Sequence, residues 1–193
     1  MSAQMSLPSE AEGLTALEAR AKHDLACLDY PAKAWVEPLA ADVEGLVLDC
    51  ALVGGGQFGL ALAFGLKREH VGNIMVYDRS PAGLEGPWMS FARMDLLRTP
   101  KDLTGPDLGV GSLTFRAWYE AQHGSAGWEA LKRIPRPVWM DFLRWYRRIS
   151  ILQLDRIVVG GRRDAGARRR RGQRPQISQF LYIRNEIFCR EYT

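Results

Sequence analysis

One glycine-rich segment contains the residues best suited to binding a ligand. It reads Gly54-Gly55-Gly56-Gln57-Phe58-Gly59, with the spacing G-x-G-x-x-G. In a turn from a strand into a helix, the first glycine of this spacing permits a tight turn, the second lets backbone approach a pyrophosphate, and the third lets the helix pack closely on the strand. The phosphates would meet unpaired N–H groups and the positive end of the helix dipole. We therefore predict that Gly54, Gly55, Gly56, Gln57 and Gly59 bind a cofactor.

The segments around these glycines occur in the order that a dinucleotide-binding unit requires. Apolar runs at 47–53 and 73–78 predict two parallel strands, and the Ala/Leu-rich segment 57–69 predicts a helix between them. Asp78 ends the second strand 19 residues after Gly59, near the distance at which a carboxylate reaches a ribose hydroxyl. A turn-forming carboxylate is the alternative interpretation of Asp78. Because these signals agree within about 30 residues, they predict an adenine dinucleotide site.

The predicted fold class is α/β, an incomplete Rossmann-like FAD/NAD(P)-binding fold with a helical N-terminal extension. We expect residues 1–44 to form the extension and its connection, and residues 45–150 to form the partial domain with this fold. Residues 151–193 form an Arg-rich, poorly ordered tail, in which 157–159 are the one expected strand. The 193 residues suit one domain of ordinary size.

Helical spacing of apolar residues predicts three further helices. The first begins with a capping box at Ser9 and Glu12 and stops by Tyr30. Its apolar face contains Leu14, Leu17, Ala21, Leu25 and Leu28. The other two helices span 113–121 and 138–149, and the aromatic residues of the last are expected in the core rather than against a ligand. Residues 80–111 are irregular, which is uncommon in a compact domain unless the loop is functional.

Charge is distributed unevenly along the chain. Residues 1–150 carry 16 Lys and Arg against 18 Asp and Glu, whereas residues 151–193 carry 10 Arg against 4 acids. Nucleic-acid binding through this tail is the least favoured of the functions that we consider. Charge runs are usually solvated, and the tail has no aromatic residue before Phe180.

The remaining composition bears on the compartment. The three cysteines share no metal or redox spacing, and the histidines form no metal-ligand pattern. No secretory signal and no apolar run of about 20 residues is apparent. We expect a cytoplasmic protein without a membrane partner or a bound metal.

Three later segments carry a family resemblance. They are Gly83-Leu84-Glu85-Gly86-Pro87-Trp88, residues 90–100 (SFARMDLLRTP) and residues 135–146 (PRPVWMDFLRWY). The first resembles the glycine-and-tryptophan loop that leads to the flavin ring in flavin-dependent monooxygenases. The other two are similar to segments of lysine and ornithine N-hydroxylases. The resemblance covers roughly residues 10–150.

This resemblance implies FAD, with its pyrophosphate at the glycines and its adenosine ribose at Asp78 and the adjacent Arg79. It implies that Trp88 and Lys101 approach the flavin, and that Arg93 lies near the carboxylate of a small amine or amino-acid substrate. From their residue types alone, Lys101 and Arg93 are equally compatible with solvated surface charges.

The C-terminal part departs from that pattern, since the NADPH site and the segment that completes the flavin domain are not recognisable. Residues 162–174 instead contain seven arginines, which suggests a truncated or frame-shifted reading of a longer gene. We interpret the chain as the FAD-binding portion of an NAD(P)H-dependent, N-hydroxylating flavin monooxygenase, inactive alone, with NAD(P)H expected only for the complete enzyme. The alternative is an NAD(P)-binding dehydrogenase domain, which should show regular βαβ repeats after Asp78.

Overall fold

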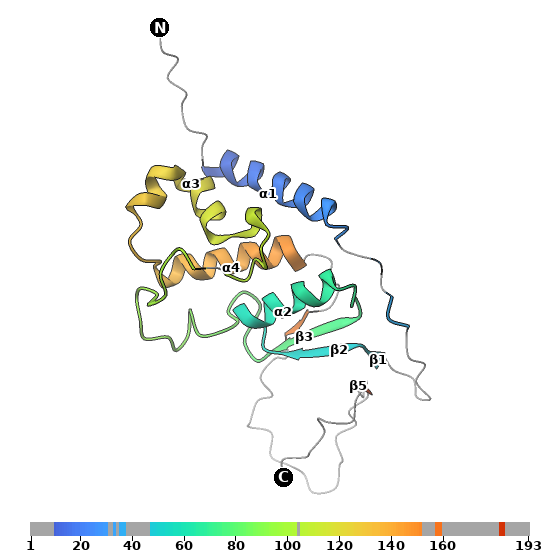
Figure 1. The fold of residues 1–193 in the computed structure, drawn as a ribbon. Coiled ribbons are helices and arrows are strands. Elements are labelled where there is room, and N and C mark those ends of the chain that lie inside the picture. The colour runs from blue at the N-terminus through green and yellow to red at the C-terminus, as the bar shows by residue number, and fades with distance from the viewer. Residues whose placement is uncertain are drawn as a thin grey trace, which may run out of the picture.

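The structure is a computed structural model of the chain, and it describes residues 10–30, 33, 35–37, 47–103, 105–151, 157–159 and 182–183. Figure 1 shows the arrangement of its helices and strands. In chain order these are α1 (Glu10–Cys27), β1 (Val47–Leu48), β2 (Cys50–Val53), α2 (Gln57–Arg68), β3 (Ile74–Asp78), η1 (Gly111–Leu113), α3 (Phe115–Ala130), α4 (Arg136–Ile151), β4 (Ile157–Val159) and β5 (Tyr182–Ile183).

Parallel strands form the sheet beside the glycine segment. β3 lies between β2 and β4 and pairs with both in parallel, with Cys50 opposite Ile74 and Val53 opposite Tyr77. A separate parallel pair joins β1 to β5. The strands predicted at 47–53, 73–78 and 157–159 are confirmed, although Asp49 divides the first into β1 and β2. Both described strands that follow residue 151 therefore pair with strands of the predicted 45–150 domain, while the rest of the predicted tail lies outside the described residues.

Helix α2 connects β2 to β3 and packs between this sheet and α4 (Figure 1). Leu60, Ala63 and Phe64 lie on its buried face, at the spacing of one helical stripe. The predicted helix over 57–69 is confirmed almost to the residue. Because neighbouring parallel strands point the same way, this β2–α2–β3 unit brings the carboxyl ends of β2 and β3 together.

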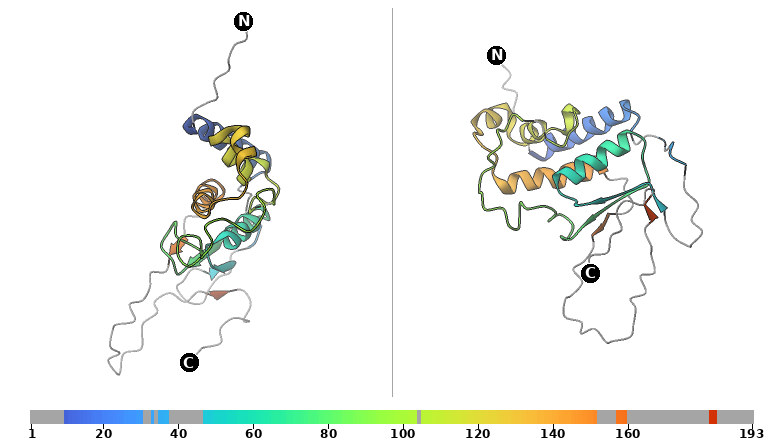
Figure 2. Two further views of the ribbon diagram at one scale, coloured as in Figure 1. Left: turned by 90° about the vertical axis from the view of Figure 1, so that its left-hand side faces the viewer. Right: turned by 60° about the horizontal axis from the view of Figure 1, so that its bottom comes forward.

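Helices α1 and α3 lie side by side, on the side of α4 away from the sheet (Figure 2). α1 confirms the predicted N-terminal helix and buries Leu17, Ala21 and Leu25. The placement of Leu28 on its buried face is wrong, because the helix ends at Cys27 and Leu28 is 48% exposed. The capping residue Ser9 lies outside the described residues.

The helix predicted over 113–121 is longer and starts later. A 3₁₀ turn, η1, comes first, and Thr114 then caps α3, its hydroxyl oxygen accepting a hydrogen bond of 3.1 Å from the Ala117 N–H. At Gly124 the backbone is non-helical, with φ +67° and ψ 175°, so α3 consists of two helical stretches joined at a kink, the second of which ends at Ala130. Glycines weaken helix propensity, which is why the sequence pattern did not extend this far.

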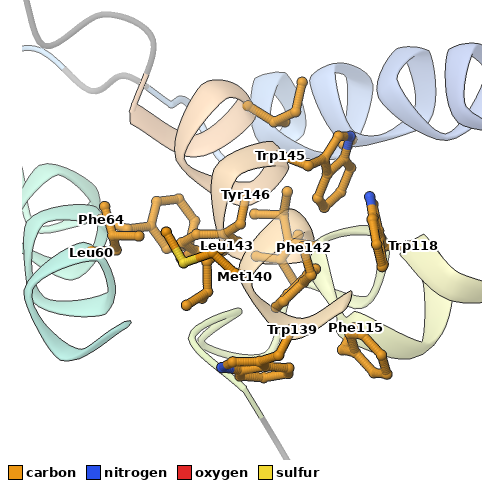
Figure 3. Close-up of a cluster of buried hydrophobic side chains, with 14 of the residues drawn as sticks. Leu60, Phe64, Phe115, Trp118, Trp139, Met140, Phe142, Leu143, Trp145 and Tyr146 are labelled. Atoms are coloured by element: carbon orange, nitrogen blue, oxygen red, sulfur yellow. The ribbon is translucent and has the colours of Figure 1, made fainter. Parts of the chain in front are cut away.

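Aromatic side chains of α3 and α4 form the centre of the core, as predicted (Figure 3). Phe142 is fully buried, and five ring centroids lie within 5.1–6.1 Å of its own. These rings belong to Phe115, Trp118, Trp139, Trp145 and Tyr146. α4 therefore joins the two halves of the fold, with α3 on one side and α2 on the other (Figure 3).

The irregular connection between β3 and η1 is ordered by side-chain hydrogen bonds. The buried carboxylate of Asp107 accepts bonds of 3.0 Å from the N–H groups of Gly105 and Gly109. The Tyr146 hydroxyl donates to the Pro106 carbonyl at 2.5 Å. These bonds add to the backbone hydrogen bonds of the loop, among them that from the Leu97 N–H to the Ile134 carbonyl at 2.8 Å.

No helix within the part of the chain that the structure describes has the length and apolarity needed to span a bilayer.

Candidate dinucleotide-binding site

The glycine turn leaves the N-terminus of α2 open. Gly54 adopts φ +108°, a conformation that favours glycine, and its N–H donates to the Tyr77 carbonyl at 2.7 Å. Gly56 is the N-cap of α2, where no side chain caps the helix, and the first turn carries no acid. The first N–H groups of α2 are therefore available to an anionic ligand, at the positive end of the helix dipole.

Gly59 allows the close contact between α2 and the turn. A Cβ atom at this position would lie 1.8 Å from the Gly54 carbonyl oxygen, a distance that no side chain tolerates. The backbone of α2 can lie this near the end of β2 only because Gly59 has no side chain. This is the close helix–strand packing expected of the third glycine in the spacing.

Gly56 also faces a second loop. A Cβ atom on Gly56 would lie 3.4 Å from the Cα atom of Gly86, which itself adopts φ +81°. This is an ordinary van der Waals distance, so the backbone of Gly86 closes one side of the Gly56 position but leaves room for a methyl group.

Asp78 lies against the same turn. Its Oδ2 accepts a hydrogen bond from the Gly55 N–H and its Oδ1 accepts one from the Ser80 N–H, both at 2.7 Å. Burial opposes ionisation, but the hydrogen bonds from Ser80 and Gly55 outweigh it and lower the pKa of the Asp78 carboxyl. The group is therefore a carboxylate at neutral pH, and each oxygen keeps acceptor capacity for a ligand hydroxyl.

An open cleft of about 960 Å³ lies at the carboxyl ends of β2 and β3. Its lining combines backbone of the turn, the carboxylate of Asp78, the exposed charge of Arg79, and two exposed apolar side chains, Val53 and Phe91. It also includes Gly54, Tyr77, Ser80, Pro81, Gly86 and Ser90. A lining that combines apolar side chains with a few polar groups is typical of a ligand-binding pocket.

Trp88 lies next to Gly86 but does not line the cleft, and its ring packs against that of Trp139, with the centroids 6.4 Å apart. Its approach to the flavin therefore stays a prediction. Its indole Nε1 is buried and has no hydrogen-bond partner among the described residues. The same nitrogen is 3.8 Å from the Cβ position of Gly86, the residue that contacts Gly56. An unpaired buried donor next to an anion-binding turn is consistent with a ligand that would accept its hydrogen bond.

The structure does not bring Lys101 and Arg93 to this cleft. Lys101 donates from Nζ to the Trp128 carbonyl at 2.6 Å and lies over the Trp128 ring, 4.5 Å from its centroid. Arg93 is exposed, and neither side chain lines the cleft. Their roles toward flavin and substrate stay predictions.

The sequence analysis missed two charged residues behind the turn, Glu85 and Arg147. They form an ion pair, and Glu85 is only 5% exposed. A signal was available in the sequence, because Glu85 lies between Gly83 and Gly86 in a loop that adjoins the predicted site.

A parallel β–α–β unit, a glycine turn at a helix N-terminus and an acid at the end of the second strand together define a dinucleotide-binding protein. The chain belongs to the FAD-NAD(P)-binding family, which matches residues 51–163, more than half of its length.

A curated relative is similar over the same region. FAD-dependent urate hydroxylase of Xanthomonas campestris pv. campestris is 55% identical over 134 residues. The match covers 69% of this chain and 28% of that relative, so the chain spans less than a third of its length. No solved structure matches. The family and this relative confirm FAD as the predicted cofactor.

Proposed function

We propose that this chain is the FAD-binding portion of a flavin-dependent monooxygenase and has a Rossmann-like fold. The observation that carries the proposal is the uncapped N-terminus of α2 at Gly56, with the Asp78 carboxylate bonded to the same turn. The similarity to a FAD-dependent hydroxylase supports flavin rather than nicotinamide as the bound group. A dehydrogenase domain would continue with βαβ repeats after β3, whereas this chain is irregular there. This difference also supports FAD over a nicotinamide cofactor.

Each group around the turn has a task in this proposal. The N–H groups at the start of α2 would hold the pyrophosphate, Asp78 would accept hydrogen bonds from the adenosine ribose, and Arg79 would flank the nucleotide. The Trp88 N–H would donate to the cofactor. FAD supplies the redox and oxygen chemistry when it is bound, and the protein contributes position and electrostatics.

The substrate of the whole protein is a second part of the proposal. The relative's name supports a urate-type substrate. The resemblance of residues 90–100 and 135–146 to lysine and ornithine N-hydroxylases supports a small amine or amino acid instead. Hydroxylation is common to both, and the resemblance to the N-hydroxylases supports NAD(P)H as the electron donor of the complete enzyme. The cysteine spacing supports a cytoplasmic location.

A shifted reading frame over the Arg-rich segment also remains a proposal. The coding DNA tests it, since a neighbouring frame that continues the similarity to the urate hydroxylase would support a frameshift, and a neighbouring frame without such similarity would contradict it.

Cofactor titrations test the FAD assignment. The full chain is titrated with FAD, NADH and NADPH, and binding is followed by flavin fluorescence and by isothermal calorimetry. We expect one FAD per chain, and neither nicotinamide cofactor should displace it. Binding of NADH or NADPH at this site without FAD binding would support the dehydrogenase alternative and overturn the proposal.

A further inference from the structure

Glu85 is a buried carboxylate with two defined partners. Its side chain is 5% exposed, and its Oε2 accepts a hydrogen bond of 2.8 Å from the Gly83 N–H. Its other oxygen accepts from Nη1 of Arg147, an α4 residue whose side chain is 21% exposed. The neighbouring Arg144 donates from Nε to the Gly83 carbonyl at 2.9 Å. Two arginines of α4 therefore hold the loop of residues 83–86.

This ion pair lies directly behind the glycine turn. A Cβ atom on Gly55 would be 3.2 Å from Cγ of Glu85, and the next loop residue, Gly86, is the one that approaches Gly56. A narrow cavity lies between the turn and α4. Its lining includes Gly55, Gly56, Glu85 and Arg147.

Two carboxylate side chains thus adjoin Gly55. Asp78 accepts a hydrogen bond from the Gly55 N–H, and both Asp78 and Glu85 lie within 3.2–3.6 Å of the position that a Gly55 Cβ atom would occupy. Two negative groups next to a site for two phosphates oppose binding, because charges close together in a partly buried site interact strongly. Arg147 is the cation paired with the more deeply buried of the two.

We propose that Arg147 is a positioning residue that acts on the FAD site through Glu85: its positive charge cancels that of the Glu85 carboxylate beside the glycine turn. The inference rests on the proposed function, because it concerns the affinity for FAD. It predicts opposite effects on FAD affinity when the charge of Arg147 or that of Glu85 is removed. Loss of Arg147 leaves a buried negative charge beside the phosphates, whereas loss of the Glu85 charge leaves a positive one.

Four variants of the full chain test this assignment by FAD titration, with thermal unfolding of each apo protein in parallel. Arg147→Met should weaken FAD binding by about tenfold or more, because an unpaired charge buried at a binding site is strongly unfavourable. Glu85→Gln keeps an acceptor for the Gly83 N–H and should bind FAD as tightly as the wild type, or more tightly. The double variant Glu85→Gln/Arg147→Met should return to within about threefold of the wild type.

Arg148→Met is the matched control, because Arg148 is the next residue of α4 and pairs with Glu18 instead. Its FAD affinity should be unchanged. If Arg147→Met does not fold, the FAD affinity of Glu85→Gln still distinguishes the two explanations. A purely structural ion pair would make Glu85→Gln bind FAD more weakly than the wild type does, whereas charge cancellation would not. Weaker binding by Glu85→Gln, or no recovery in the double variant, would overturn the inference alone. A wild-type chain that does not bind FAD would overturn the proposed function and this inference with it.

Discussion

The Oδ2 atom of Asp78 lies 2.7 Å from the backbone nitrogen of Gly55, so the acid at the end of β3 is bonded to the turn that follows β2. These residues are 23 positions apart in sequence and meet because β2 and β3 are parallel neighbours. The bond fixes the carboxylate beside the start of α2, where a ribose and its phosphates would be adjacent. Asp78 therefore both shapes the turn and offers acceptors to the ligand.

Replacing Asp78 with Asn should weaken both the fold and cofactor binding. One carboxylate oxygen becomes an NH₂ group that cannot accept from Gly55 or Ser80, and we expect a loss of about 1.5–3 kcal/mol in the free energy of unfolding. FAD affinity should fall by about tenfold for the same reason. Chemical denaturation and FAD titration measure the two effects.

The stability difference between these two proteins should depend on pH. Because the pKa of Asp78 is lowered in the folded protein, the wild-type advantage should be complete above the unfolded value of about 3.9 and disappear as the pH falls through the lower folded value. A difference that grows on acidification would contradict the assigned hydrogen bonds.

Gly59→Ala should be strongly destabilising, because its new methyl group would lie 1.8 Å from the Gly54 carbonyl oxygen. Forcing α2 away from the turn should cost about 3 kcal/mol or more, by analogy with overpacked cores. Gly65→Ala on the same helix is the control, since its methyl group would meet only a flexible tip of Leu108, at 3.2 Å. Urea denaturation should show a large loss for Gly59→Ala and a change within about 1 kcal/mol for the control. Equal stabilities would contradict the close packing.

Tyr146→Phe should destabilise the irregular loop. It removes the hydrogen bond to the Pro106 carbonyl and leaves that buried acceptor unpaired, which should cost about 1–3 kcal/mol. Burial raises the pKa of Tyr146, so the hydroxyl stays protonated and the effect should not change between about pH 6 and pH 9. Hydrogen exchange should show faster opening around Pro106, whereas Tyr119→Phe on α3 should leave this loop unchanged. An unaltered exchange rate in Tyr146→Phe would count against the role given to this bond.

The 193-residue chain loaded with FAD should show no appreciable NADPH oxidation with urate, lysine or ornithine. It spans 28% of the urate hydroxylase that it resembles, and positioning of donor and substrate is most of what a flavoprotein adds to its cofactor. The full-length Xanthomonas enzyme is the matched control in a spectrophotometric assay. Comparable rates for the two proteins would contradict this prediction.

Local sequence patterns predicted one part of this molecule well. The unit from β2 to β3 was predictable because its glycines, apolar runs and terminal acid lie within about 30 residues and obey known steric rules. The contacts of Glu85 with Arg147 and of Tyr146 with Pro106 were not predictable, because they join residues 62 and 40 positions apart through an irregular loop. The placement of Lys101 on Trp128 depends on how α3 packs, which no local pattern encodes.

Flavin content after purification is the most direct test of whether the turn at residues 54–59 holds FAD. Gly56→Val places a branched side chain where Gly86 and the phosphates would approach, since even a Cβ atom there lies 3.4 Å from Gly86. Gly111→Val is the control, because a Cβ atom at that position meets nothing within 4 Å.

All three proteins are purified in the presence of FAD, and the absorbance of bound flavin is measured per chain, together with thermal unfolding. We expect about one FAD per chain for the wild type and for Gly111→Val, and loss of bound flavin in a folded Gly56→Val. Unchanged flavin content in Gly56→Val would contradict the placement of FAD at this turn.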